Sequence, residues 1–219
     1  MDAGTLGPKL AKTFPKGTVL FREGDPGAEM FIILSGSIRV SKQIGNLERT
    51  ITVMGAGEFI GEMAILTGEN RSATATIEDE ARLVPIDAAM LENLVARSPE
   101  VAVRLLKRLA FRLKATNDLA AILLHRDARV RVVRGVALLV ETRGVDRGED
   151  EVYIEVSPVE LAGQLGLEPA EVTEVLERLE RGGMIASVPG EGGYTVRDLE
   201  RLREFVDFIT ARETLGELG

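Results

Sequence analysis

Two short segments, residues 61–64 and 71–74, combine residue types that can hold an anion beside a hydroxyl group. Gly61 allows the backbone to approach a bound group closely because it has no side chain. Residues 62–66 have the composition of one helical turn, whose free N–H groups and dipole attract an anion. Arg71 adds a planar, permanently charged fork that matches the geometry of a phosphate.

The neighbouring side chains supply the other contacts that such a site needs. Ser72 offers a hydroxyl to the anion, and Glu62 can accept a hydrogen bond from a neutral hydroxyl such as that of a ribose. The simplest alternative is a surface ion pair between Glu62 and Arg71, which would contribute little stability. A phosphate next to a sugar hydroxyl describes a nucleotide, so we expect a nucleotide site here.

The composition excludes several other kinds of chemistry. The 219 residues include no cysteine and one histidine, His125. Disulfides, thiolate catalysis, cysteine-bound zinc and iron–sulfur clusters are therefore excluded, as is any site that needs two histidines. We expect no metal, and no haem at His125, which lies near the end of a predicted helix. Since the chain shows no metal cluster and no base–nucleophile pair, we expect that it is not an enzyme.

The segments that must position these residues begin with β-strands. Short apolar runs alternate with glycines, a pattern typical of an antiparallel β-roll or barrel. The predicted strands span residues 18–21, 30–34, 38–41, 49–54, 73–77 and 83–86. We expect residues 1–97 to form this first domain.

A long helix is predicted next. Ser98, Pro99 and Glu100 resemble a helix start, and neither glycine nor proline interrupts residues 100–125. The spacing of one apolar seam is that of a coiled-coil dimer; its members are Ala102, Leu106, Leu109, Leu113, Thr116, Ala120 and Leu123. A second apolar face (Leu105, Phe111, Ile122) offers the alternative that the helix packs on its own β-domain. We expect residues 98–126 to form a homodimer helix.

We expect residues 127–219 to form an output domain that contains both helices and strands. A capping-box spacing at Ser157 and Glu160 opens one helix, and Pro169 opens the next. The predicted helices span about 129–141, 157–166, 169–181 and 199–209, and the predicted strands 152–156, 184–188 and 194–196. Helix, turn, helix and hairpin in this order form a winged helix-turn-helix, here with an extra C-terminal helix. The fold class is therefore α+β.

These motifs resemble the cyclic-AMP receptor protein (CRP/FNR) family of bacterial regulators. Gly61-Glu62-Met63-Ala64 followed by Arg71-Ser72-Ala73-Thr74 is similar to the phosphate-binding cassette of that family. An earlier motif is also similar to the family's; it consists of Gly24-Asp25-Pro26-Gly27, Met30-Phe31-Ile32-Ile33 and Gly36. The resemblance covers about residues 15–196.

The resemblance implies a role for each matching residue. Glu62 would accept from the ribose 2′-OH, and Arg71 and Ser72 would hold the cyclic phosphate. Thr116 matches the family's threonine that contacts adenine at the dimer interface, and Asn117 stands where the family has a serine. Asn117 can still donate and accept, so cAMP is favoured and cGMP is the alternative. The implied ligand residues are Gly61, Glu62, Met63, Ala64, Arg71, Ser72, Ala73, Thr116 and Asn117.

The output of the second domain has two interpretations. Family resemblance implies DNA binding, with base-reading positions on the helix from Pro169. In this interpretation the basic start of the helix over residues 129–141 would supply phosphate contacts. The residues implied are Arg129, Arg131, Pro169, Ala170, Glu171, Thr173 and Glu174. However, residues 145–219 hold 18 acidic and 7 basic residues, which opposes binding to phosphates. The alternative is that this acidic domain docks on a protein partner, and the simplest alternative is a solvated face.

The sequence also bears on location. No apolar run approaches the roughly 20 residues that a membrane span requires. The first ten residues lack the charged-then-apolar pattern of a signal peptide. We expect a cytoplasmic protein that does not contact membranes.

Overall fold

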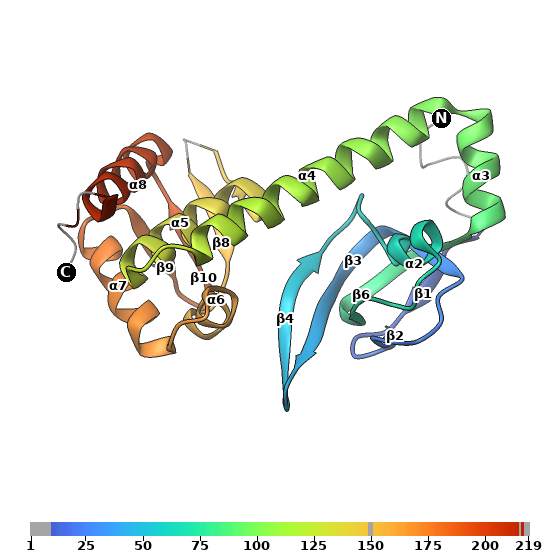
Figure 1. Ribbon diagram of the computed structural model, residues 1–219, viewed down its shortest axis with the longest axis horizontal. Coiled ribbons are helices and arrows are strands. Elements are labelled where there is room, and N and C mark those ends of the chain that lie inside the picture. The colour runs from blue at the N-terminus through green and yellow to red at the C-terminus, as the bar shows by residue number, and fades with distance from the viewer. Residues whose placement is uncertain (1–9, 149–150, 215, 217–219) are drawn as a thin grey trace. The chain divides into compact units, whose positions relative to one another are not determined.

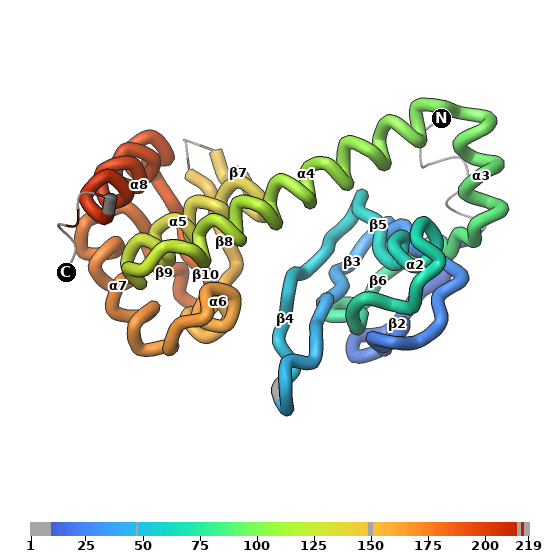
Figure 2. The backbone as a smooth tube through the Cα atoms, in the orientation of Figure 1, coloured from blue at the N-terminus to red at the C-terminus, as the bar shows by residue number. Residues whose placement is uncertain are grey.

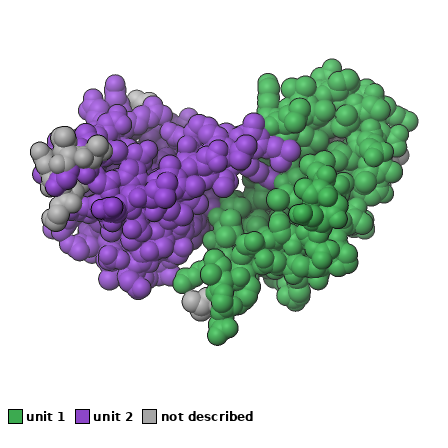
Figure 3. All heavy atoms as spheres, viewed as in Figure 1, with its two compact units in different colours: residues 1–107 green, residues 108–219 purple. Residues whose placement is uncertain are grey.

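The computed structural model describes residues 10–148, 151–214 and 216. The chain forms two compact units, residues 1–107 and 108–219 (Figure 3). The division falls inside helix α4 (Pro99–Leu123), the segment predicted from the sequence as the dimerisation helix.

The first unit contains an antiparallel sheet and two short helices (Figure 1). Among the described residues the sheet has six strands in the order β1-β6-β3-β4, with β2 paired to β6 and β5 paired to β3. The strands are β1 (Lys12–Phe14), β2 (Val19–Phe21), β3 (Glu29–Ile44), β4 (Leu47–Met54), β5 (Phe59–Ile60) and β6 (Thr74–Asp87). The helices are α2 (Glu62–Thr67) and α3 (Ala88–Arg97). The predicted antiparallel β-roll is confirmed, and α3 is an element that the strand pattern does not predict.

Strands predicted as separate runs are continuous in two places, 30–34 with 38–41 in β3 and 73–77 with 83–86 in β6. The pairing of β3 with β6 shifts register between Ile33 and Ile38. Gly36, between them, has a φ of 82°, and a Cβ there would lie 2.2 Å from the carbonyl oxygen of Glu80. This glycine therefore marks a bend within a strand rather than a turn between two strands.

The core of the first unit lies on one face of the bent sheet. Alternate residues point inward along each strand, as Phe31 and Ile33 do on β3 and Ala75 and Ile77 do on β6. Burial of each large apolar side chain contributes about 1.5–3 kcal/mol. The packed sheet therefore fixes the positions of the loops and of the short helix α2 that connect its strands.

Helix α4 begins at the predicted proline, Pro99. Ser98 ends α3, and its hydroxyl donates to the Glu100 carboxylate at 2.6 Å rather than accepting from a backbone N–H of α4. The predicted seam of α4 is largely exposed in the single chain, with Leu106 at 65% and Leu113 at 62%. From the second apolar face, Ile122 is buried, whereas Phe111 is 46% exposed.

The second unit holds the remaining elements (Figure 2). The helices are α5 (Ala128–Arg143), α6 (Pro158–Leu165), α7 (Pro169–Arg181) and α8 (Leu199–Thr214). The strands β7 (Val145–Asp146), β8 (Val152–Glu155), β9 (Ile185–Val188) and β10 (Gly193–Val196) form an antiparallel sheet in the order β7-β8-β10-β9. The predicted winged helix-turn-helix and the C-terminal helix are confirmed, although α8 continues five residues past the predicted end.

Local signals set the helix boundaries of this unit. The Ser157 side chain accepts from the Glu160 N–H at 3.1 Å, as the capping box predicts. Gly166 ends α6 with a φ of 63°, a left-handed conformation that favours glycine. The buried faces of the helices meet in one core, to which α8 contributes Leu202 and Ile209.

We predict that Gly36→Ala destabilises the protein far more than Gly45→Ala. Both glycines have positive φ, so each substitution carries about 1–2 kcal/mol of backbone strain. Only at Gly36 does the new Cβ meet backbone atoms, which adds about 1–3 kcal/mol of overpacking. Urea unfolding measures both free energies, and equal losses would contradict this account of the bend.

Candidate functional site

Arg71 is the centre of the predicted anion site, and it is buried. Its side chain is only 7% exposed. Nη1 donates to the carbonyl oxygen of Gly61 at 2.9 Å, and Nη2 donates to that of Glu29 at 2.7 Å. The guanidinium carbon lies 4.1 Å from the centre of the Phe21 ring. Within the described part of the chain, the buried Nε–H has no hydrogen-bond acceptor.

The backbone of Arg71 is held as firmly as its side chain. Its N–H donates to the carbonyl oxygen of Asp25 at 2.8 Å, and its own carbonyl accepts from the N–H of Gly24 at 2.9 Å. These two bonds join the segment before β6 to the loop between β2 and β3. The guanidinium therefore projects from a fixed backbone position.

Two glycines allow the guanidinium to lie this close to the backbone. A Cβ on Gly27 would lie 2.6 Å from Nε of Arg71 and 2.7 Å from Cβ of Ala64. A Cβ on Gly61 would lie 2.5 Å from Nη1, and Gly61 also has a φ of 85° as it leads into α2. The local fold therefore requires glycine at both positions.

The charge of Arg71 is only partly compensated by its surroundings. Burial lowers the pKa of the Arg71 guanidinium, and the nearby carboxylates of Glu29, Asp25 and Glu62 oppose that shift. Arginine keeps its proton even when its pKa falls, because its ordinary value lies so far above neutral pH. A buried cation with one free N–H is a strong attractor for an anion.

The structure brings the rest of the predicted cassette together around Arg71. Glu62 and Ala64 on α2 are buried, with exposed fractions of 5% and 4%. Met63 and Ser72 lie at the surface, and the Ser72 hydroxyl is 3.5 Å from the Met63 sulfur. Ala73, directly before β6, is half-buried.

Thr116 and Asn117 belong to the second unit, whereas the cassette belongs to the first. Both side chains are exposed on α4. The Thr116 hydroxyl donates to the carbonyl oxygen of Arg112 at 2.9 Å, one turn earlier in the helix. A threonine hydroxyl held in this way still has lone pairs that can accept a further hydrogen bond.

The two arginines predicted to contact phosphates are used inside the second unit. Arg129 binds the Asp127 carboxylate through Nε at 3.1 Å and Nη2 at 2.7 Å, and this carboxylate raises the pKa of Arg129. Arg131 donates from Nε to the carbonyl oxygen of His125 at 2.8 Å. Both side chains therefore hold the start of α5, and neither is a wholly free phosphate contact.

The predicted base-reading residues lie at the start of α7. Pro169, Ala170, Glu171 and Glu174 are exposed, and Thr173 is half-buried. The Glu171 carboxylate accepts from the N–H of Glu168 at 3.0 Å, which caps the helix. Glu174 pairs with Arg178 one turn later, and the Thr173 hydroxyl donates to the carbonyl oxygen of Pro169 at 2.8 Å.

The sequence reasoning missed the residues that enclose Arg71. Glu29 contributes a backbone carbonyl and Phe21 contributes a ring face. Gly27 leaves room for the guanidinium because it has no side chain. Gly27 lies in the early glycine motif, so its type was a usable signal. A backbone carbonyl leaves no trace in the sequence, because any residue type supplies one.

Two kinds of feature are absent from the part of the chain that the structure describes. No helix has both the length and the apolar character needed to cross a membrane. Nor do three or more histidine, aspartate or glutamate side chains gather in a group that could hold a metal ion.

Comparison with known proteins agrees with this architecture. Residues 11–98 match the cyclic nucleotide-binding domain, and residues 119–205 match the Crp-like helix-turn-helix domain. The chain is 31% identical over 174 residues to a CRP-like cAMP-activated global transcriptional regulator of Mycobacterium tuberculosis, and the match covers 78% of each protein. It is 29% identical over 180 residues to a cyclic AMP receptor protein of Thermus thermophilus, covering 82% of this chain and 81% of the other.

A solved structure supports the same conclusion. A transcriptional regulator of the CRP/FNR family from Thermus thermophilus is 26% identical, with a TM-score of 0.67 and coverage of 90% of this chain and 98% of the other. The relatives are transcription regulators, which confirms the prediction that the chain is not an enzyme. The chain belongs to the CRP/FNR family of cyclic-nucleotide-responsive transcription regulators.

Proposed function

We propose that this chain is a cAMP-responsive regulator that works in the cytoplasm as a homodimer and acts on DNA through its winged helix. The observation that carries the ligand assignment is the buried Arg71 guanidinium with its free Nε–H. A buried donor without an acceptor is unfavourable in a folded protein unless a ligand satisfies it. A cyclic phosphate supplies the charge and the acceptor oxygens that this group needs.

The residues around Arg71 fit the other parts of such a ligand. Ser72, exposed beside the guanidinium, would donate its hydroxyl to the phosphate. Glu62 would accept from the ribose 2′-OH, as the family resemblance implies. The donors near Arg71 and the Glu62 carboxylate on α2 together support a cyclic nucleotide over a simple anion. A simple anion has no hydroxyl group that could donate a hydrogen bond to Glu62.

The preference for cAMP over cGMP rests on Thr116 and on the two relatives whose names specify cAMP. The Thr116 hydroxyl would contact the base, and Asn117 stands where the family has serine. An amide side chain is longer than a hydroxymethyl group and offers both a donor and an acceptor. We therefore propose cAMP as the ligand, with discrimination that depends mainly on Thr116.

The homodimer is supported by the exposed seam of α4. Leu106 and Leu113 are exposed and would bury apolar surface against a partner, and each such side chain contributes about 1.5–3 kcal/mol on full burial. Their heptad spacing favours pairing with the same helix of a second chain. Thr116 lies in the same seam, which is where the family resemblance places the base contact.

A second candidate for the output is docking on a protein. The helix α7 exposes Glu168, Glu171, Glu174 and Glu177, and its early turns contain no basic residue. Arg129 and Arg131 are occupied by internal contacts. This surface would repel phosphates and would suit a partner with a basic face.

Arg71→Ala is expected to weaken cAMP binding strongly. The lost charge-assisted hydrogen bonds correspond to at least about 1.5–3 kcal/mol, or about tenfold to more than a hundredfold in Kd. Titration calorimetry gives the affinity, and Arg82→Ala, at an exposed arginine of β6, serves as the matched control. Unchanged affinity in Arg71→Ala would refute the ligand site.

Thr116→Ala is expected to weaken binding less and to reduce the preference between bases. A neutral hydrogen bond contributes about 0.5–1.5 kcal/mol, so the affinity for cAMP should fall by about 2- to 10-fold. The affinities of wild type and variant for cAMP and cGMP are measured side by side. An equal loss for both nucleotides would show that Thr116 does not read the base.

The output is tested by selection from a pool of random duplex DNA at low salt, with and without saturating cAMP. Low salt favours phosphate contacts, so it gives an acidic domain its best opportunity to bind. We expect cAMP-dependent enrichment of a two-fold symmetric site, as a dimer requires. No enrichment, with cAMP binding confirmed on the same sample, would refute DNA binding and favour the protein-docking candidate.

A further inference from the structure

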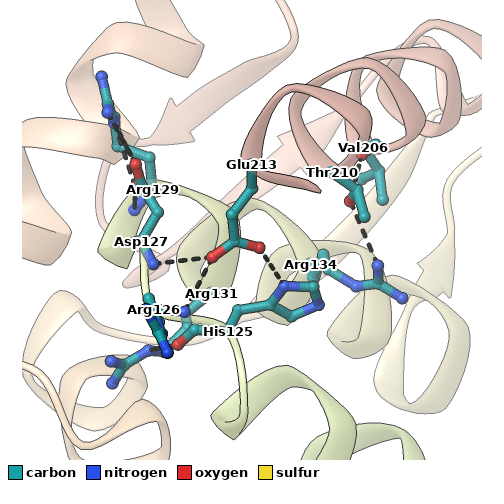
Figure 4. A network of polar contacts seen from close by, with 9 residues as sticks. All are labelled: His125, Arg126, Asp127, Arg129, Arg131, Arg134, Val206, Thr210 and Glu213. Atoms are coloured by element: carbon teal, nitrogen blue, oxygen red, sulfur yellow. Dashed lines mark hydrogen bonds and ion pairs between the residues drawn. The ribbon is translucent and has the colours of Figure 1, made fainter. Parts of the chain in front are cut away.

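The last turn of α8 contacts the short joint between α4 and α5 (Figure 4). The joint consists of residues 124–127, and all of its contacts with α8 lie within the second unit. Helix α4 begins in the first unit and ends at this joint, so the chain from the nucleotide-binding unit reaches α5 through the joint. The conformation of the joint can therefore affect the orientation of α5 relative to α4.

One carboxylate on α8 makes three polar contacts with the joint. Oε1 of Glu213 accepts from the N–H of Arg126 at 2.8 Å and from that of Asp127 at 2.9 Å. Oε2 forms a short contact with Nδ1 of His125. Glu213 and His125 are 17% and 20% exposed, so these contacts are largely shielded from water.

The charge on Glu213 is stabilised where it lies. Although burial alone would raise it, the pKa of Glu213 is lowered by the N–H of Asp127, the His125 side chain and the N–H of Arg126. A lowered pKa means that the folded state favours the carboxylate, so the contact is complete at neutral pH and weakens only in acid, below the ordinary value of 4.5.

The remaining polar groups of the joint are directed toward α5. The Asp127 carboxylate accepts from the N–H of Arg129 at 2.7 Å and caps that helix. Arg131 reaches back to the carbonyl oxygen of His125. The joint is thus held to α5 by Asp127 and Arg131 and to α8 by Glu213.

Helix α8 does not need Glu213 in order to stay in place. Leu202 and Ile209 are buried in the core of the second unit. Arg134 on α5 donates from Nη1 to the Thr210 hydroxyl at 3.2 Å, a separate contact between the same two helices. Removing the Glu213 carboxylate would therefore free the joint without detaching α8.

We propose that Glu213 is a positioning residue that locks the α4–α5 joint, and that this lock transmits nucleotide binding to the winged helix. A rigid joint passes a movement of α4 directly to α5, whereas a loose joint absorbs it. The role of Glu213 in locking the joint follows from its contacts with residues 125–127. Its role in transmission rests on the proposed response to nucleotide. The alternative is that Glu213 only adds stability to α8.

The lock is tested by hydrogen exchange of the full chain, with mass spectrometry of peptides that cover residues 123–130. In Glu213→Ala we expect the amides of Arg126 and Asp127 to exchange at least about tenfold faster, since both lose their acceptor. Glu204→Ala replaces an exposed glutamate of the same helix and should change nothing at the joint. Glu213→Gln keeps one acceptor oxygen, so it should restore part of the protection. Unchanged exchange at the joint in Glu213→Ala would overturn the lock.

Transmission is tested on the same samples with saturating cAMP. In wild type, nucleotide should change the exchange of residues 157–183, and in Glu213→Ala this response should fall by at least about half, while cAMP affinity stays within about twofold. A full response in Glu213→Ala, despite a loosened joint, would show that Glu213 only stabilises. If wild type binds no nucleotide, the proposed function and the transmitting role both fail, and exchange at the joint still decides whether Glu213 locks it.

Discussion

The architecture of the first unit depends on one buried cation. The Arg71 guanidinium is held by two carbonyl oxygens and an aromatic face, and its backbone is tied to the loop before β3. These partners come from different parts of the chain, so the site exists only when the sheet and its loops are folded together. The glycines at 27 and 61 are then required by packing around that cation. Burying a charge is costly unless it is compensated, and the incomplete compensation here is what makes the unit receptive to an anion.

The sequence allowed the cassette and the winged helix to be predicted because their signals are local. Ser157, Gly166 and Pro169 act within a turn of themselves, and α7 has the predicted bounds. The continuity of β3 through Gly36 was not predictable in the same way, since a glycine with positive φ serves a turn and a bulged bend equally well. The contacts of Arg71 with Glu29 and of Glu213 with residues 125–127 depend on the tertiary structure. The spacing of residues in the sequence does not predict such contacts.

The second unit shows how the same residue types take different roles according to their neighbours. The sequence places four arginines at or just before the start of α5, in a pattern that resembles a basic patch; they are Arg126, Arg129, Arg131 and Arg134. In the structure Asp127 caps α5 and the Arg129 side chain binds the Asp127 carboxylate. Arg131 donates to the carbonyl oxygen of His125 in the joint, and Arg134 donates to the Thr210 hydroxyl on α8. An arginine that donates to acceptors within the protein has fewer N–H groups available to bind a phosphate. Composition therefore overstates the attraction of this surface for phosphate.

The acidic face of α7 has a consequence for how the protein would search a genome. Non-specific affinity for DNA comes almost entirely from counterions released at phosphate contacts, and it competes with the specific site at every other position along the chromosome. Helix α7 would release few counterions on contact with DNA, because it exposes four acidic side chains, Glu168, Glu171, Glu174 and Glu177. If the chain acts on DNA as proposed, it would spend little time on the wrong sequences, so a larger share of its copies would stay free to respond to its ligand. Moderate affinity at the correct sequence would then be enough for occupancy, and with fewer phosphate contacts that occupancy would depend less steeply on salt.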